Sequence, residues 1–332
     1  MICDSIELKA VIVKIAEVAV KLSRIISLGK KDQSLNESMG INTDGDDQKT
    51  LDVLADEAYM QNLQNTDVRL YVSEEEEVVV ELNKEGCIAI AINPLDGSSN
   101  IDTNVSIGSI FSIREIESKR AKIDEDLNKT FLEPGSKQIG AGYIIFGPQT
   151  IMVLTLGEGV QQYTLDRDLN SFFLIDKQRR IPNETREYAV NASNARHLSQ
   201  PMQKYIEDSN AGEFGPRGSN FNMRWDASLV AETHRILSRG GILIYPADQR
   251  KDYSSGRLRM VYECAPIAFL IEQAGGSATD CIKRILDVPA ISLHSRTPFA
   301  FGSKNEVSKL QAYHDLPNEE PSPLFGRRGL FN

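Results

Sequence analysis

The segment 93–100 combines the residue types that bind metal ions and phosphate groups. It reads Asn-Pro-Leu-Asp-Gly-Ser-Ser-Asn and directly follows the apolar run 88–92, which alternates bulky Ile with small Ala as a buried strand does. Pro94 cannot extend a strand ladder, so we expect the strand to end there. Asp96 offers carboxylate oxygens, and the backbone N–H groups of Gly97, Ser98 and Ser99 can hold phosphate oxygens. The segment therefore predicts a metal-and-phosphate site at a sheet edge.

Four more carboxylates stand near the ends of expected elements: Asp52, Glu74, Glu75 and Glu263. If they gathered around Asp96 they would repel one another unless divalent cations neutralised them. Oxygen ligands at a phosphate site favour Mg²⁺ or Mn²⁺. A pair of such ions can activate a water molecule and stabilise the departing alkoxide, which is the chemistry of phosphoester hydrolysis.

Each of these carboxylates alone has an ordinary explanation. Glu74 and Glu75 belong to a run of four glutamates of the kind that usually faces solvent. Asp52 in the first turn of a helix compensates the helix dipole, and Glu263 could cap the helix that follows it. Only their combination with the Asp96 turn favours the functional interpretation.

The hydrophobic pattern predicts the elements that must position these residues. Helices are expected from about Asp4 to Gly29, over 51–65, from Asp226 to Arg239, and from Pro266 to Gly275. Strands are expected at 68–72, 78–82, 105–113, 140–146, 151–156, 161–165, 172–175 and 242–245. The polar segment 30–49 is expected to be a mobile functional loop, and the charged segment 115–137 is a candidate domain boundary. The mixture predicts an α/β fold of the layered α+β kind.

Composition narrows the function classes. A chain of 332 residues with 41% hydrophobic residues can bury a large core, whereas a net charge of -10 argues against a nucleic-acid partner. The four cysteines form no zinc-binding pattern and are expected to be free thiols. Charged residues interrupt the N-terminal apolar stretch, so it predicts neither a signal peptide nor a membrane span. We therefore expect a cytoplasmic protein without a membrane partner.

Motifs in order along almost the whole chain resemble class I fructose-1,6-bisphosphatase, within the lithium-sensitive, metal-dependent sugar phosphatases that include inositol monophosphatase. The segments that carry the resemblance are 51–54 (LDVL), 73–75 (SEE), 94–102 (PLDGSSNID), 106–111 (SIGSIF), 140–143 (GAGY), 258–259 (LR) and 262–266 (YECAP). The closing segment 323–331 is similar to the tail of certain proteobacterial members.

This resemblance implies a sugar phosphatase fold with two sheet-and-helix halves: residues 1–185 for metal and phosphate, and residues 186–332 for the sugar phosphate. It implies hydrolysis of the 1-phosphate of fructose 1,6-bisphosphate. The reaction would depend on Mg²⁺ or, as the alternative, Mn²⁺, with two or more ions per subunit. A homotetramer acting in gluconeogenesis or the Calvin cycle is the corresponding expectation for assembly and pathway.

The resemblance also assigns roles to individual residues. The catalytic group would be Asp46, Asp52, Glu75 and Arg259, with Asn42 in the same loop as Asp46. The metal ligands would be Glu74, Glu75, Asn93, the carbonyl of Leu95, Asp96 and Glu263. The substrate-binding group would be Asp96, Gly97, Ser98, Ser99, Asn191, Asn194, Arg224, Tyr245 and Arg257, with Trp225 beside them. The counterpart of Arg224 reaches the site of a neighbouring subunit.

Asn93 is the main departure from the family pattern, which has a metal-binding aspartate there. The missing charge predicts weaker metal affinity or activity. It leaves open a weakly active, binding-only homologue, besides a related sugar or inositol phosphatase or one that also accepts sedoheptulose 1,7-bisphosphate. The AMP site of animal members is not recognisable, because Cys87-Ile88 and Glu115 replace its charged residues.

Overall fold

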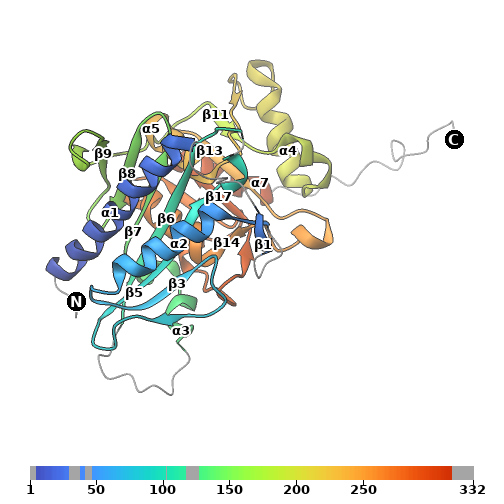
Figure 1. Cartoon of the computed structure of the whole chain (residues 1–332). Coiled ribbons are helices and arrows are strands. Elements are labelled where there is room, and N and C mark those ends of the chain that lie inside the picture. Colours follow the sequence, from blue (N-terminus) through green and yellow to red (C-terminus); the bar gives the residue numbers. More distant parts are fainter. Residues whose placement is uncertain (1–4, 30–37, 42–46, 102, 117–126, 316–332) are drawn as a thin grey trace.

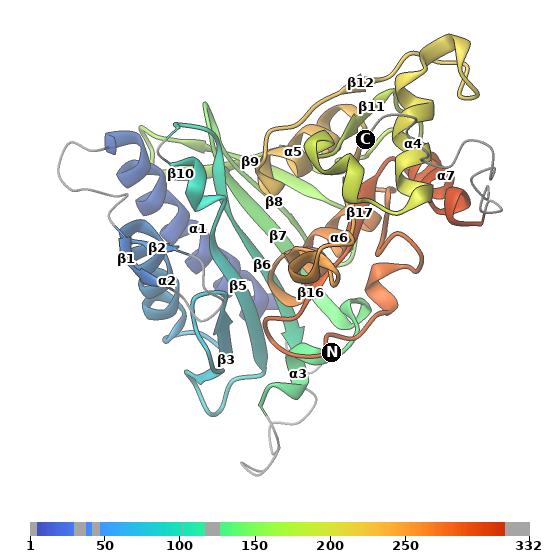
Figure 2. The same cartoon turned by 90° about the vertical axis from the view of Figure 1, so that its right-hand side faces the viewer.

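The computed structural model describes residues 5–29, 38–41, 47–101, 103–116 and 127–315. Within them the chain forms alternating layers of helix and sheet (Figures 1 and 2). Two N-terminal helices cover one face of a large sheet, two further helices lie between this sheet and a smaller one, and two more cover the far face of the smaller sheet. This arrangement confirms the expected α/β class.

The large sheet is mostly antiparallel, with one parallel pair formed by β3 and β5. Across the sheet its strands are β10 (Ser171–Asp176), β9 (Gln161–Asp166), β8 (Thr150–Thr155), β7 (Gln138–Phe146), β6 (Ile107–Glu115), β5 (Ile88–Asp96), β3 (Val68–Ser73) and β4 (Val80–Glu81). One face packs against α1 (Ser5–Leu28) and α2 (Thr50–Leu63). Helix α1 presents Val11, Ile15 and Val18 to this core at helical spacing, as its sequence pattern predicts.

The smaller sheet contains both parallel and antiparallel pairs. Its strands in order are β12 (Asn222–Met223), β11 (Glu187–Ala189), β13 (Ile242–Tyr245), β17 (Phe299–Gly302) and β15 (Ser277–Thr279). Its outer face packs against α4 (Gln200–Asn210) and α7 (Lys304–His314). Outside both sheets, β14 (Leu258–Arg259) pairs with β16 (Arg296–Thr297), and α3 (Lys129–Leu132) is a short helix.

Helices α5 (Leu229–Arg239) and α6 (Ala265–Gln273) form the middle layer. Their apolar side chains share one core with β6, β7 and β8 on one side and β13 and β17 on the other. The short turns of helix are η2 (Ser98–Asn100), η3 (Gly135–Lys137), η4 (Ala192–His197), η5 (Gly212–Phe214), η6 (Lys251–Tyr253), η8 (Ile285–Asp287) and the π-helical η7 (Met260–Cys264). The middle layer thus joins the two sheets through one hydrophobic core.

Several expected boundaries are wrong. Strand β5 runs to Asp96 and does not end at Pro94, because the pairing of β5 with β6 shifts register between Asn93 and Asp96, and such a bulge tolerates proline. Ser228, and not Asp226, caps α5, accepting a hydrogen bond from the N–H of Ala231. The segment 115–137 is no domain boundary, since β6 and β7 on either side of it are neighbours in one sheet.

Other expectations need smaller corrections. The segment 30–49 contains two short paired strands, β1 (Ser38–Ile41) and β2 (Asp47–Lys49). Cys264 and Cys281 are free and buried, as expected, whereas Cys87 is disulfide-bonded and the free-thiol expectation is wrong for it. Of the helices in the described ranges, none has the length and apolarity needed to cross a membrane.

Gly108 sits where α5 meets the large sheet and leaves no room for a side chain. A Cβ there would lie 2.2 Å from the carbonyl oxygen of Ile144 and 2.7 Å from a methyl group of Val230. We expect Gly108→Ala to lower the free energy of unfolding by about 3 kcal/mol, because backbone and a packed helix must both move. Urea unfolding followed by circular dichroism measures this change.

Gly157→Ala is the matched control. No atom lies within 4 Å of a Cβ at Gly157, and the only cost is its left-handed φ of 90°. That cost is about 1 kcal/mol. Equal losses for the two variants would contradict the close packing of α5 on β6.

Candidate active site

Two carboxylates from separate parts of the chain, Glu74 and Glu263, contact Arg259, and a third, Asp96, lies near enough for charge interactions with both. Asp96 ends β5, Glu74 follows β3, and Glu263 lies in η7; Asp96 and Glu263 are buried. The backbone N–H of Arg259 donates to Glu263 Oε2 at 2.6 Å, and its Nη1 lies 2.6 Å from Glu74 Oε1. Arg259 therefore links residues about 190 positions apart in the chain.

These carboxylates are hard to ionise together. Burial raises the pKa of Asp96 to about 7; the N–H of Val230, which donates to Asp96 Oδ2, opposes this increase and the charge of Glu74 adds to it. Burial also raises the pKa of Glu263 to about 7, with the charge of Asp96 adding to the effect and Arg259 opposing it. A nearby cation would reverse this effect.

The π-helical turn η7 orients Glu263. Pro266 has no N–H and cannot make the hydrogen bond that an α-helix would require from that position. The N–H of Ala265 instead reaches back to the carbonyl of Met260, a wider turn than that of an α-helix. Such π-turns occur frequently at functional sites.

The other expected metal and catalytic residues lie on neighbouring elements. Asp52 is buried in the first turn of α2, which packs against β5. The backbone N–H of Glu75 donates to Ser73 Oγ at 3.0 Å. Asn93 is buried, and its Oδ1 accepts a hydrogen bond from the N–H of Leu95 at 3.2 Å, which stabilises the bulge before Asp96. Asp46 and Asn42 lie outside the described residues.

The donor set fits a hard divalent cation. Its members are carboxylate, amide and carbonyl oxygens, and the pKa values of Asp96 and Glu263 are raised mainly by burial and further by neighbouring negative charge, which such an ion would neutralise. Within the described part of the chain, no three His, Cys, Asp or Glu side chains are grouped closely enough to hold an ion. Arg259 pairs with Glu74, and this pair must open if Glu74 is to bind metal. The metal-ligand assignment stays a prediction.

A cavity of about 230 Å³ joins the carboxylates to the C-terminal half. Its walls are Asp96, Gly97, Asn191, Trp225, Ala227, Ser228, Leu229, Glu232, Leu243, Tyr245, Leu258 and Glu263. The rings of Trp225 and Tyr245 lie 5.6 Å apart at 34° and form one wall. The cavity therefore combines acidic groups at one end with an aromatic surface at the other.

A smaller recess, of about 20 Å³, adjoins this cavity and shares the lining residues Asn191 and Tyr245 with it. Its lining also includes Asn194 and Arg257. The guanidinium of Arg257 lies 3.6 Å from the ring centre of Tyr253, which fixes a cation at this end. The structure thus brings together four of the expected substrate-binding residues: Asn191, Asn194, Tyr245 and Arg257.

Of the other expected substrate residues, Asp96 and Gly97 line the larger cavity, whereas Ser98, Ser99 and Arg224 line neither space. Ser98 and Ser99 lie in η2, just beyond Gly97. Arg224 is half-exposed, with its Nε 3.8 Å from Glu187 Oε1. Its role at the site of a neighbouring subunit stays a prediction.

Sequence reasoning missed several residues at this site. Arg296 contributes positive charge near Glu263, Glu232 lines the larger cavity, and Tyr253 supports Arg257. Ala227 also lines the cavity, with a left-handed φ of 53° that is unusual for alanine. None of these four residues stands in a local pattern that would have identified it. Ser228, which also lines the cavity, does stand in one, because a serine three residues before Ala231 is a recognisable helix cap.

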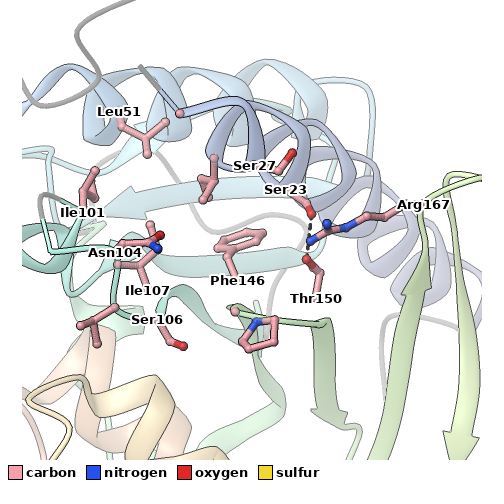
Figure 3. Close-up of a pocket in the computed structure, with 15 residues that line it drawn as sticks. Ser23, Ser27, Leu51, Ile101, Asn104, Ser106, Ile107, Phe146, Thr150 and Arg167 are labelled. Atoms are coloured by element: carbon pink, nitrogen blue, oxygen red, sulfur yellow. Dashed lines mark hydrogen bonds between the residues drawn. The ribbon is translucent and has the colours of Figure 1, made fainter. Parts of the chain in front are cut away.

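A second cavity, of about 450 Å³, lies elsewhere and is not this site. Figure 3 shows it between the end of α1, the β7–β8 turn and the segment after η2. Ser23 Oγ and Thr150 Oγ1 are hydrogen-bonded at 2.7 Å on its wall. No carboxylate is among its described lining residues, so it lacks the charge needed to hold divalent metal.

Both halves of the chain match known protein families. A family described as "Fructose-1-6-bisphosphatase, N-terminal domain" matches residues 5–177, and one described as "Fructose-1-6-bisphosphatase, C-terminal domain" matches residues 181–315. These matches, together with the relatives below, define a phosphoric monoester hydrolase.

Curated relatives and solved structures agree with this class. The chain is 54% identical to fructose-1,6-bisphosphatase class 1 1 of Bradyrhizobium sp. (96% of this chain, 91% of the relative) and 55% identical to fructose-1,6-bisphosphatase class 1 of Paracoccus denitrificans (96% and 93%). It superimposes on Leishmania major fructose-1,6-bisphosphatase in holo form with a TM-score of 0.89 at 33% identity (95% and 96% covered), and on the apo form with 0.83 at 31% (94% and 95%). The chain belongs to the class 1 fructose-1,6-bisphosphatase family, which implies a divalent metal requirement.

Neutralising Asp96 should stabilise the metal-free protein at high pH. A folded-state pKa raised to about 7 means that stability is lost as pH rises from the unfolded pKa near 4 to 7, where the buried group ionises. We expect Asp96→Asn to raise the free energy of unfolding at pH 8 by about 2 kcal/mol, and by less at pH 5. Urea unfolding in EDTA measures the two values.

Asp168→Asn is the control, because Asp168 is exposed in a turn. It should change stability by less than about 0.5 kcal/mol at either pH. A destabilised Asp96→Asn at pH 8 would show that Asp96 is not under charge repulsion.

Proposed function

We propose that the protein hydrolyses the 1-phosphate of fructose 1,6-bisphosphate, giving fructose 6-phosphate and inorganic phosphate in a Mg²⁺-dependent reaction. The observation that carries this proposal is the pair of adjoining cavities that share Asn191 and Tyr245: the larger is lined by Asp96, Gly97 and Glu263, and the smaller by Asn194 and Arg257. A sugar bisphosphate would place one phosphate against Arg257 and the other, together with divalent cations, against the carboxylates. Family membership supports the same reaction.

The recess would hold the phosphate that is not cleaved. Arg257 supplies a charge-assisted donor, and the ring of Tyr253 beneath it limits the conformations that its side chain can adopt. Asn191 and Tyr245, which line both spaces, would bind at the junction between this phosphate and the sugar. Trp225 and Tyr245 offer the apolar wall for the ring.

The acidic end would hold the reacting phosphate with its cations. Glu74, Glu75, Asp96, Glu263 and the carbonyl of Leu95 are the proposed ligands, and Asn93 the weaker replacement for an aspartate. When bound, Mg²⁺ supplies a water of lowered pKa and charge to stabilise the leaving alkoxide. Glu75, with Asp46 and Asp52, is proposed to accept the proton of the attacking water. Arg259 is proposed to contact the phosphate once its guanidinium group has separated from Glu74.

The reaction would serve gluconeogenesis or the Calvin cycle in the cytoplasm. We propose a homotetrameric assembly in which Arg224 completes a neighbouring site. The half-exposed position of Arg224 and its long contact with Glu187 support this idea, since the side chain is available to a partner.

Activity and metal dependence can be tested together with Asn93→Asp. Purified protein should release phosphate from fructose 1,6-bisphosphate only with a divalent cation. The aspartate keeps the acceptor oxygen that Leu95 uses and adds one negative charge. We expect it to lower the Mg²⁺ concentration for half-maximal rate about five- to tenfold, roughly 1 kcal/mol of binding. A phosphate-release assay over a Mg²⁺ series measures both effects.

Asn170→Asp, in the exposed β9–β10 turn, is the control and should leave the Mg²⁺ dependence unchanged. Turnover absent in the natural chain but present in Asn93→Asp would favour the binding-only alternative. A faster rate on inositol monophosphate or sedoheptulose 1,7-bisphosphate than on fructose 1,6-bisphosphate would favour the related-phosphatase alternatives.

The role of Arg224 can be tested with mixed oligomers. Asp96→Asn removes the carboxylate of its own site, and Arg224→Ala would remove a cation from the site of the neighbour. Each variant alone should lose most activity at low substrate concentration. Co-expressed with two different affinity tags and purified through both, the mixed oligomer should regain activity, because some sites then have both residues.

Two controls make this test specific. Pairing Asp96→Asn with Glu263→Gln, both in the same cavity, should give no recovery. If the oligomer of Asp96→Asn with Arg224→Ala also fails to regain activity, Arg224 acts in its own subunit or not at all.

A further inference from the structure

A further cavity, lined mainly by basic side chains, lies at the outer edge of the smaller sheet. It has a volume of about 520 Å³, and none of its lining residues lines the catalytic cavity or its recess. The walls come from the segment that enters β11, from the segment before β12, from the end of α5 and from α7. They are Glu184, Thr185, Arg186, Glu187, Arg217, Ser219, Phe221, Arg239 and Lys309. We call this cavity the basic pocket.

The charge of the basic pocket is opposite to that of the whole chain. Four basic and two acidic side chains line it, in a protein with a net charge of -10. Both acidic residues have partners outside the cavity. Asn305 Nδ2 donates to Glu184 Oε1 at 2.5 Å, and Arg235 Nη1 lies 2.6 Å from Glu187 Oε2. The lining therefore has more basic than acidic side chains, although Glu306 behind it offsets part of the charge of Arg217 and Lys309.

Arg217 is a built part of this pocket rather than a mobile surface cation. Its side chain is only 7% exposed, and it donates to Ser209 Oγ at 3.0 Å and to Glu306 Oε1 at 2.5 Å. The guanidinium lies between the rings of Tyr205 and Phe221, at 5.1 and 4.2 Å from their centres. Fixing one cation in this way reduces the entropy lost when an anion binds.

The other three cations are long and exposed at the rim. Arg186 forms no ion pair within the described residues. Arg239 lies 3.6 Å from Glu187, and Lys309 lies 3.9 Å from Glu306, both at the long end of ion-pair distances and with more than half of each side chain exposed. Exposed pairs of this kind contribute little to stability, so these cations can turn toward a ligand at small cost.

We propose that the basic pocket binds a small phosphate-bearing polyanion, separately from the catalytic site. Guanidinium groups pair with phosphate oxygens through two parallel N–H donors, which favours phosphate over a single carboxylate. The volume of about 520 Å³ suits a ligand of two phosphate groups or a phosphorylated metabolite.

One residue, Arg235, connects the basic pocket to the catalytic cavity. Glu187 contacts Arg239 of the pocket, Arg224 at 3.8 Å and Arg235 at 2.6 Å, and Arg235 in turn binds Glu232 of the catalytic cavity at 2.8 Å. An anion that binds Arg239 competes with Glu187 for it. The site therefore lies where a bound ligand changes the charge around Arg224.

The test is calorimetric titration of the full chain with inorganic pyrophosphate, in EDTA at low ionic strength. The double variant Arg186→Ala/Lys309→Ala removes two exposed rim cations that the proposed catalytic mechanism does not use. We expect it to weaken one class of binding site at least tenfold. Arg257→Ala should leave that class intact, because Arg257 belongs to the catalytic recess.

Arg24→Ala/Lys177→Ala is the matched control, because it removes one exposed arginine and one exposed lysine from other parts of the chain. It should leave the affinity unchanged. The proposal is overturned if Arg186→Ala/Lys309→Ala binds pyrophosphate as tightly as the natural chain. It is also overturned if both double variants lose affinity equally, because that result indicates attraction by overall charge. Loss of all pyrophosphate binding in Arg257→Ala also overturns it. Circular dichroism of each variant verifies that the chain is folded.

Discussion

The burial of two neighbouring carboxylates, Asp96 and Glu263, is the constraint on which the rest of the site depends. Folding brings the end of β5 and the π-helical turn η7 together, although each carboxylate raises the cost of ionising the other. Arg259 offsets part of this cost by binding Glu263 through its backbone and Glu74 through its side chain. A site that is destabilised without a cation binds one more strongly, because the same repulsion is relieved on binding.

The sequence predicted the order and type of the helices and strands better than it predicted where each of them ends. Helix α1 and strands β7 to β10 follow hydrophobic periodicities that depend only on which face is buried, and their bounds agree within about two residues. The end of β5 did not follow the rule for Pro94, because a bulge let the strand continue to Asp96. Proline disfavours a regular ladder, but the pairing partner β6 decides whether a bulge forms, and local sequence does not contain that information.

The C-terminal half likewise contains some residues that the sequence identified and others that it did not. Asn191, Tyr245 and Arg257 were found through family segments, and the structure brings them together. Tyr253 and Arg296 were not found, because their importance comes from packing across elements: Tyr253 lies under Arg257, and Arg296 pairs with Arg259 across β14 and β16. Such residues have no fixed spacing from those they support, so no motif contains them.

Helix α5 explains how the two halves can keep one cavity in register. Its first turn supplies the N–H of Val230 to Asp96, while Ser228 and Glu232 from the same end line the cavity. The helix is held against the large sheet by the close approach of Val230 to Gly108, and against the smaller sheet through the shared middle core. The acidic end of the cavity and its aromatic wall are therefore both fixed to one rigid element. Glu187 contacts Arg235 and Arg239 of this helix as well as Arg224, so the charges at its far end belong to the same network as those near the substrate wall.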